Sequence, residues 1–344
     1  MSTSFSSLPI VSLATLRDSV PHSPSNTKNF IALSKRLDEV FSTTGFAYLT
    51  DLPLAHTHED VFNLCDKFFG PNGLSTEEKM KVAKKTFVST NTNTYRGYFP
   101  PQEGDDNLKE GFECGAASDK RVTSARINQK FDLTEPNVFP KSQEDVQLYC
   151  EALHRDLQGL SRELLSLLAL ALGKPATFFE DYLKDSLSTL RLLHYPPVPA
   201  SRQQELICTP HTDSGILTLL HQDKTGGLEV RNSEGEWIPA PYVPGSVVVN
   251  IGDLLAKVSG GRWIATYHRV RSSKKEGSEA KGRYSVPFFF EPGAQCVVKS
   301  VNSDEQVVYG EHLLDKMKGW VEFQDVVEDE PEYIVVDKAA IEAF

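Results

Sequence analysis

The sequence predicts a mainly β fold with supporting α-helices, and two observations carry this prediction. From Leu190 onward, short apolar runs alternate with turns that contain Gly, Pro and Asp, as in antiparallel sandwiches and barrels. Before that point, apolar residues recur at helical spacing, most clearly over residues 142–172. A chain of 344 residues, 40% of them hydrophobic, can bury one large core. We therefore expect one compact unit in which helices brace a β-barrel.

The first part of the chain is predicted to alternate between strands and helices. The expected elements are strands over residues 8–13 and 46–49, helices over residues 28–44 and 58–69, and short strands near residues 95–99. Gly45 should end the first of these helices. Residues 88–141 are rich in Asn, Thr, Pro, Gly and Asp, so most of this stretch should be loop.

The helix over residues 142–172 should support the sheet that follows it. Ser142 and Asp145 resemble a capping box at its start, and Gly173 followed by Pro175 should end it. The strands expected after it cover residues 190–195, 216–221, 227–230, 246–251, 263–270 and 283–290. The predicted segments are a mixed α/β region over 8–125, supporting helices over 142–183, a strand-rich core over 187–293 and a C-terminal extension over 294–344.

The composition limits which binding partners and which cellular compartment we expect for the protein. A formal net charge of -11 argues against nucleic acid or an anionic membrane as partner. The dense basic stretch over residues 79–85 is interpreted as the solvated face of a short helix. The five cysteines form no Cys-x-x-Cys pair, and no stretch approaches the ~18 apolar residues of a membrane span. We expect a cytoplasmic protein with a small-molecule substrate, and the oligomeric state stays open.

A histidine two residues before an aspartate occurs four times, and local structure separates the four pairs. These are His58/Asp60, His154/Asp156, His211/Asp213 and His221/Asp223. The first two fall in helical patterns, where side chains two residues apart diverge, and the fourth opens a turn. Only His211 and Asp213 enter an extended run, in which they would share one face.

His268 is the candidate for a third metal ligand, because it lies in a strand-like segment 55 residues after Asp213. Two histidines and one carboxylate leave coordination positions open, which suits iron(II) that must bind oxygen and an organic ligand together. A strand over residues 283–290 would put Arg283 and Ser285 on one face, where they could bind a carboxylate. Taken alone, each of these residues could also be an ordinary core or salt-bridge residue.

The chain resembles the isopenicillin N synthase-like branch of the iron(II)/2-oxoglutarate-dependent dioxygenases. The motifs occur in family order over about residues 9–323. They comprise residues 9–11, 45–48, 96–98, 109–113, 190–197, 211–213, 249–253, 268–270 and 283–285. The resemblance implies a double-stranded β-helix, or jelly roll, with helical support.

By the same resemblance, His211, Asp213 and His268 match the iron ligands, and Fe(II), 2-oxoglutarate and dioxygen are the implied cofactors. The residues that would bind 2-oxoglutarate are Arg283, Ser285 and Tyr195. Two departures from the family pattern occur. Leu193 stands where an asparagine is frequent, with His194 as a candidate replacement for its polar contact, and residues 273–278 appear as an insertion that should extend a hairpin tip.

The implied activity is oxidation of a C–H bond of a small organic metabolite, by hydroxylation, desaturation or cyclisation, with release of succinate and carbon dioxide. A role in specialised metabolism is expected. The candidates for lining the substrate pocket are Tyr95, Arg96, Tyr98, Phe112, Arg191, Leu193 and Phe289. Two alternatives stay open: an oxidase of the same fold that needs no 2-oxoglutarate and binds its substrate's carboxylate at Arg283 and Ser285, and, more distantly, a non-catalytic jelly-roll binding protein.

Overall fold

The computed structural model describes residues 4–17, 24–101, 108–117, 126–128, 131–197, 206–272 and 282–317. A larger sheet contains β1 (Ile10–Ser12), β2 (Phe46–Thr50), β3 (Gly97–Phe99), β4 (Glu110–Cys114), β7 (Thr189–Tyr195), β9 (Leu217–Gln222), β12 (Val247–Ile251) and β14 (Arg283–Phe290). A smaller sheet contains β8 (Leu206–His211), β10 (Leu228–Arg231), β11 (Trp237–Pro239) and β13 (His268–Arg271). The strand orders are β1-β2-β12-β9-β14-β7-β4-β3 and β11-β10-β13-β8. Strands from the N-terminal region therefore complete both edges of the larger sheet.

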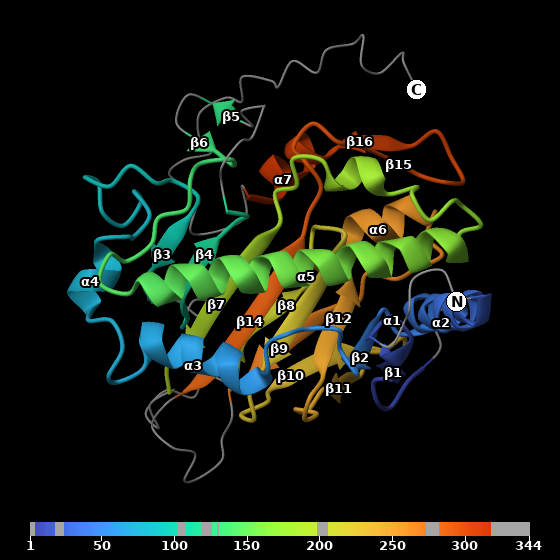
Figure 1. The fold of residues 1–344 in the computed structure, drawn as a ribbon, viewed down its shortest axis with the longest axis horizontal. Coiled ribbons are helices and arrows are strands. Elements are labelled where there is room, and N and C mark those ends of the chain that lie inside the picture. The colour runs from blue at the N-terminus through green and yellow to red at the C-terminus, as the bar shows by residue number, and fades with distance from the viewer. Residues whose placement is uncertain are drawn as a thin grey trace.

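The helices are α1 (Ala14–Arg17), α2 (Pro24–Thr43), α3 (His58–Phe69), α4 (Thr76–Met80), α5 (Glu144–Ala171), the 3-10 helix η1 (Glu180–Leu183), α6 (Asp253–Val258) and α7 (Tyr309–Met317). Two small hairpins pair β5 (Arg126–Asn128) with β6 (Phe131–Asp132) and β15 (Val297–Lys299) with β16 (Gln306–Val308). Helix α5 crosses the strands of the larger sheet in Figure 1, with α3 beside it. No helix in the described ranges is long and apolar enough to cross a membrane.

Two hydrophobic clusters lie on opposite faces of the larger sheet. The bigger one joins that sheet to α2, α3 and α5, and includes Val286 and Phe288 of β14. The other one lies between the two sheets and includes Leu193 and Tyr195 of β7 together with Val230 of β10. Because side chains alternate along a strand, the strands of the larger sheet can contribute to both clusters. The two facing sheets with helices outside one of them confirm the predicted mainly β jelly-roll core.

The predicted helices are present in the structure, although α2 begins at Pro24, before the predicted residue 28, and the predicted start of α5 is wrong. Helix α3 has the predicted bounds, and α2 ends just before Gly45, whose φ of 69° is the left-handed conformation expected of a helix stop. The predicted capping box at Ser142 is wrong, because α5 begins after Gln143 without any side-chain cap, and Asp145 instead forms an ion pair with Lys67 of α3. A partner distant in sequence has replaced the local one.

The interpretation of the basic stretch is wrong for two of its lysines. Lys79 is 8% exposed and Lys84 is fully buried, although Lys81 lies on the surface. Lys79 donates to Glu110 at 2.7 Å, and Lys84 donates to Glu113. Burial of a lysine is tolerated when a carboxylate compensates its charge. Both carboxylates come from β4, a strand that the residue pattern did not predict.

Candidate metal centre

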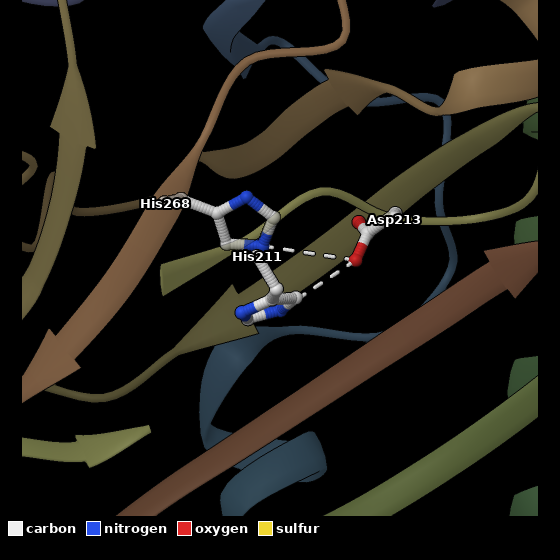
Figure 2. Close-up of side chains that lie close together, drawn as sticks. All are labelled: His211, Asp213 and His268. Atoms are coloured by element: carbon white, nitrogen blue, oxygen red, sulfur yellow. Dashed lines mark ion pairs between the residues drawn. The ribbon is translucent and has the colours of Figure 1, made fainter. Parts of the chain in front are cut away.

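His211, Asp213 and His268 converge at one end of the space between the two sheets. They are the one group of metal-ligating side chains in the described ranges whose donor atoms all lie within 4.8 Å of one another. The Nε2 atoms of His211 and His268 lie 3.8 and 3.7 Å from Asp213 Oδ1. Figure 2 shows the three side chains pointing toward one another. Two imidazole nitrogens and one carboxylate oxygen suit iron(II) with open coordination positions.

Strand pairing brings the two histidines together across the smaller sheet. His211 ends β8 and His268 begins β13, and the two residues are directly paired in the antiparallel register. Their ring centroids are 4.2 Å apart. The prediction that His268 lies within a long strand is only partly right, because residues 263–267 do not belong to a strand. The prediction that residues 273–278 extend a hairpin tip falls outside the described residues.

The extended run predicted for His211 and Asp213 ends too early to orient the aspartate. Strand β8 stops at His211, so Asp213 lies in the segment that follows it. Its Oδ2 accepts hydrogen bonds from Thr218 of β9 at 2.5 Å and from Asn250 of β12 at 2.7 Å. These two bonds leave Oδ1 facing the imidazoles. The carboxylate is thus oriented by the larger sheet, while the histidines belong to the smaller one.

Backbone carbonyls orient both imidazole rings. Nδ1 of His211 lies 2.8 Å from the Thr209 carbonyl, and Nδ1 of His268 lies 3.2 Å from the Thr266 carbonyl. When Nδ1 donates to a carbonyl, Nε2 carries the lone pair that a metal needs. Both Nε2 atoms face the aspartate.

The electrostatics of the three groups differ. Burial lowers the pKa of His268 to about 4, which keeps this imidazole neutral. Burial also acts against the charged form of His211, but the neighbouring Cys208 and Asp213 outweigh it and raise the pKa to about 9. Burial opposes ionisation of Asp213 as well, yet the two histidines and the two hydrogen bonds hold the pKa of its carboxyl below the ordinary value. An anionic carboxylate is the form that binds metal.

Arg283 and Ser285 lie on the inner face of β14, on the surface that also carries Tyr195. Arg283 lies opposite Tyr195 of β7 in the antiparallel register. Its guanidinium lies over the Tyr195 ring, 5.1 Å from the ring centroid. Nε of Arg283 donates to the Gly226 carbonyl at 2.8 Å, and its buried Nη1 has no hydrogen-bond partner among the described residues. A buried guanidinium N–H without a partner fits a bound carboxylate.

The candidate pocket residues separate onto two faces of the larger sheet. Tyr98 and Phe112 lie on the outer face, where Tyr98 donates to Glu110 at 2.6 Å and Phe112 packs 4.7 Å from Phe68 of α3. The structure therefore does not support these two as pocket residues. The sequence pattern did not delimit their strands, so the alternation of faces could not be assigned there.

Arg191, Leu193 and Phe289 lie on the inner face. Tyr95 is buried in the bigger hydrophobic cluster. Arg96 is fully buried with its guanidinium 4.6 Å from the centre of the Tyr95 ring, and it donates to Thr189 at 2.6 Å. These contacts give Arg96 a structural role.

His194 does not replace the polar contact that Leu193 lacks. Leu193 faces the space between the sheets, whereas His194, the next residue of β7, faces the opposite side. Its Nδ1 lies 2.8 Å from Glu110 Oε1, and its ring lies 5.2 Å from that of Tyr284. Adjacent residues of a strand point to opposite faces, so a neighbour cannot substitute for a lost side chain.

The sequence did not single out Thr218 or Lys84 as parts of this region. Glu113 and Asn250 each occurred within a family motif, but the bond of Asn250 to Asp213 joins residues 37 positions apart. Thr218 is five positions from Asp213, on the next strand. The strand pattern of residues 216–221 could have placed Thr218 on the same face as Leu220, but not beside the aspartate.

Two family models match the chain. One describes the 2OG-Fe(II) oxygenase superfamily and matches residues 186–292. The other, described as non-haem dioxygenase in morphine synthesis N-terminal, matches residues 8–142. The first match includes all three converging side chains together with Arg283 and Ser285.

Curated relatives and solved structures agree with these matches. The chain is 31% identical to the homoarginine-6-hydroxylase 2-ODD-233 of rice, over 92% of this chain and 98% of the relative. It is 27% identical to the 1-aminocyclopropane-1-carboxylate oxidase of Dictyostelium mucoroides, over 91% and 88% of the two chains. Among solved structures, a full-length Neurospora crassa protein in complex with alpha-KG and thymine superposes with a TM-score of 0.73 at 25% identity, over 90% and 96%.

Proposed function

This chain belongs to the 2OG-Fe(II) oxygenase superfamily, and from that premise we propose that it oxidises a C–H bond of a small organic metabolite at iron held by His211, Asp213 and His268. The protein is a non-haem iron(II)- and 2-oxoglutarate-dependent dioxygenase that uses Fe(II), 2-oxoglutarate and dioxygen. The observation that carries the proposed site is the convergence of two Nε2 atoms on Asp213 Oδ1, with the other carboxylate oxygen already bonded.

In this proposal, each group of residues has a separate task. Iron and 2-oxoglutarate, when bound with dioxygen, supply the oxidant that removes hydrogen from the substrate, with release of succinate and carbon dioxide. Arg283 and Ser285 bind the distal carboxylate of 2-oxoglutarate, and Tyr195 fixes the guanidinium by stacking against it. The apolar side chains between the sheets exclude water from the reacting centre.

The names of the relatives favour a small polar substrate. The rice relative is a homoarginine hydroxylase, and the Neurospora neighbour was crystallised with thymine. For this chain we propose a substrate of similar size that carries polar groups, bound near Arg191, Leu193 and Phe289. Specialised metabolism in the cytoplasm is the proposed setting.

The test is an anaerobic titration of iron(II)-loaded protein with 2-oxoglutarate, followed by the visible charge-transfer band of the chelate. The wild-type protein should give a saturable band, Asp213→Ala should give none, and Arg283→Ala should need at least tenfold more 2-oxoglutarate, since a charged hydrogen bond contributes roughly 1.5–3 kcal/mol. Arg269→Ala is the matched control. Arg269 follows His268 but pairs with Glu229 and stacks on Trp237, so its loss should leave the titration unchanged.

A wild-type protein that holds iron but shows no band would overturn the proposed 2-oxoglutarate site. The remaining candidate would then be the oxidase that needs no 2-oxoglutarate, with the Dictyostelium relative, an oxidase by name, as the point of comparison. Oxygen consumption with iron(II) alone would then be measured.

A further inference from the structure

The segment that carries Asp213 is held by residues from other parts of the chain. Residues 212–216 join β8 to β9 and belong to neither strand. The backbone groups of such a segment need hydrogen-bond partners outside it when they are buried. Because the Asp213 carboxylate faces both imidazoles through Oδ1, the residues that bond to this segment also help to position a metal ligand.

The start of α6 supplies partners for three of the four backbone carbonyls in residues 213–216. The N–H···O bonds run from Asp253 to Asp213 at 2.8 Å, from Leu254 to Gly215 at 3.1 Å and from Gly252 to Ile216 at 2.9 Å. The two segments are in backbone contact, because a Cβ atom at Gly252 would overlap the Gly215 carbonyl. The strand that leads into α6 also contains Asn250, which donates to Asp213 Oδ2. Side chain and backbone of the aspartate are thus held by one stretch of the chain.

The fourth carbonyl, that of Ser214, accepts from the C-terminal helix α7. Nε2 of His312 lies 3.2 Å from this carbonyl oxygen. A carbonyl oxygen can only accept, so Nε2 carries the hydrogen in this bond. Ser214 directly follows Asp213 in the chain. His312 therefore acts one residue away from a proposed metal ligand, although the two residues are 99 positions apart in the sequence.

The neighbours of His312 on α7 keep the helix in this position. Residues 309, 312 and 316 lie on one side of a helix. Tyr309 is fully buried. Lys316 pairs with Asp253 at 2.9 Å, the residue whose backbone N–H donates to the Asp213 carbonyl. The helix is thus attached both to the segment of Asp213 and to the start of α6 that supports this segment.

We propose that His312 is a positioning residue for the metal centre, which holds the Ser214 carbonyl and thereby keeps Asp213 where its carboxylate can bind iron. This inference rests on the proposed function, because it takes Asp213 as an iron ligand. The two family matches end at residues 142 and 292, so α7 lies outside both of them. Asp213 keeps its bonds to Thr218 and Asn250 when His312 is lost, so iron binding should weaken without disappearing.

The experiment measures the iron(II) affinity of the full-length protein by anaerobic equilibrium dialysis. His312→Ala should bind iron about 3- to 10-fold more weakly than the wild-type protein, the range expected for one neutral hydrogen bond. His312→Gln should bind iron within about twofold of the wild-type protein, because its side-chain amide can donate to the same carbonyl. Lys257→Ala is the matched control, since Lys257 also belongs to α6 but pairs with Glu305 at 2.9 Å. Its iron affinity should equal that of the wild-type protein.

Urea unfolding of the same metal-free proteins separates a positioning role from a merely structural one. A merely structural role would lower the free energy of unfolding of His312→Ala and leave the iron affinity of the folded protein unchanged. That result would overturn the inference. A loss of iron affinity that His312→Gln does not restore, or that Lys257→Ala shares, would overturn it as well.

These failures differ from failure of the proposed function. In that case the wild-type protein binds no iron, or binds it as tightly as Asp213→Ala does. In the present case the wild-type protein binds iron and Asp213→Ala does not, whatever the result at position 312.

Discussion

Two groups of histidines lie on opposite faces of β9. On the inner face, Thr218 supports the aspartate that joins His211 and His268. On the outer face, the His221 ring packs 4.9 Å from His58 and 5.6 Å from His56. The ring centroids of His211 and His268 in the metal centre are 4.2 Å apart, so the distances between rings are similar in the two groups. Proximity of imidazoles therefore does not distinguish them.

The carboxylate and the orientation of the rings make the difference. In the metal centre, an aspartate fixed by two hydrogen bonds faces both Nε2 atoms, and both Nδ1 atoms lie against carbonyls. In the outer group, neither ring nitrogen of His221 has a hydrogen-bond partner in the described ranges. The nearest carboxylate contact there is Asp156, 3.5 Å from His56 Nδ1. A histidine becomes a ligand where a second set of residues orients it.

The largest expected effect comes from removing one histidine from each of the two groups in turn. His268→Ala should lower iron affinity by more than about 100-fold, since loss of a ligand should exceed the 10–100-fold loss seen for outer-shell partners. His221→Leu should keep iron binding at the wild-type level. Equilibrium dialysis with iron(II) and succinate formation are the measurements. Full iron stoichiometry in His268→Ala would remove this residue from the ligand set.

The next effect concerns the residues that orient the carboxylate. Asn250→Ala should reduce iron affinity by about 10–100-fold, because Asp213 Oδ2 loses a donor and the carboxylate can rotate. Asn232→Ala is the control, since this buried asparagine bonds to Phe5 and Glu236 at the end of β10. Equal losses in both variants would indicate general destabilisation instead of a role at the metal.

The sequence predicted the metal centre from residue types and the strand over residues 283–290 from its apolar run, and the structure brings the three predicted ligands together. Strand β14 has the predicted bounds, because a continuous apolar strand is specified by its own residues. The pairs His58/Asp60 and His154/Asp156 fall in α3 and α5, as the helical spacing predicted. Asp223 accepts from the Thr225 backbone at 2.9 Å, as expected of a turn.

The predictions that failed concern features that depend on contacts between segments distant in the sequence. The orientation of Asp213 comes from β9 and β12 rather than from β8, and burial of Lys84 depends on a carboxylate 29 positions away. The faces of Tyr98 and Phe112 could not be assigned, because short strands within a loop-rich region carry no clear alternation. Local patterns specify elements, whereas the support of a site is specified by tertiary packing.

The outer histidines should make the stability of the fold depend on pH. Burial lowers the pKa of His56, His58 and His221 in the folded protein, so the unfolded chain takes up protons first as the pH falls. The free energy of unfolding should be at its full value above about pH 6.5 and should decrease below it. Each unit of pKa difference corresponds to about 1.4 kcal/mol.

His221→Leu should flatten this dependence, which urea unfolding at about pH 7.5 and about pH 5.5, on either side of the ordinary histidine pKa, would measure. The metal should be saturating, so that titration at His211 and His268 does not contribute. A variant that loses as much stability on acidification as the wild-type protein would show that His221 does not titrate with folding.

The smallest effect tests whether the first of the four His-x-Asp pairs has only a structural role. Thr57 caps α3, where its hydroxyl accepts from the Asp60 backbone at 3.2 Å while the Asp60 carboxylate accepts from the Thr57 backbone at 2.8 Å. Thr57→Ala should lower the free energy of unfolding by about 1 kcal/mol, the usual loss for a helix cap. Iron affinity should not change, because Asp60 is committed to the capping box. A change in iron affinity with unchanged stability would mean that the two histidine groups are coupled through β9, and the separation between them would no longer hold.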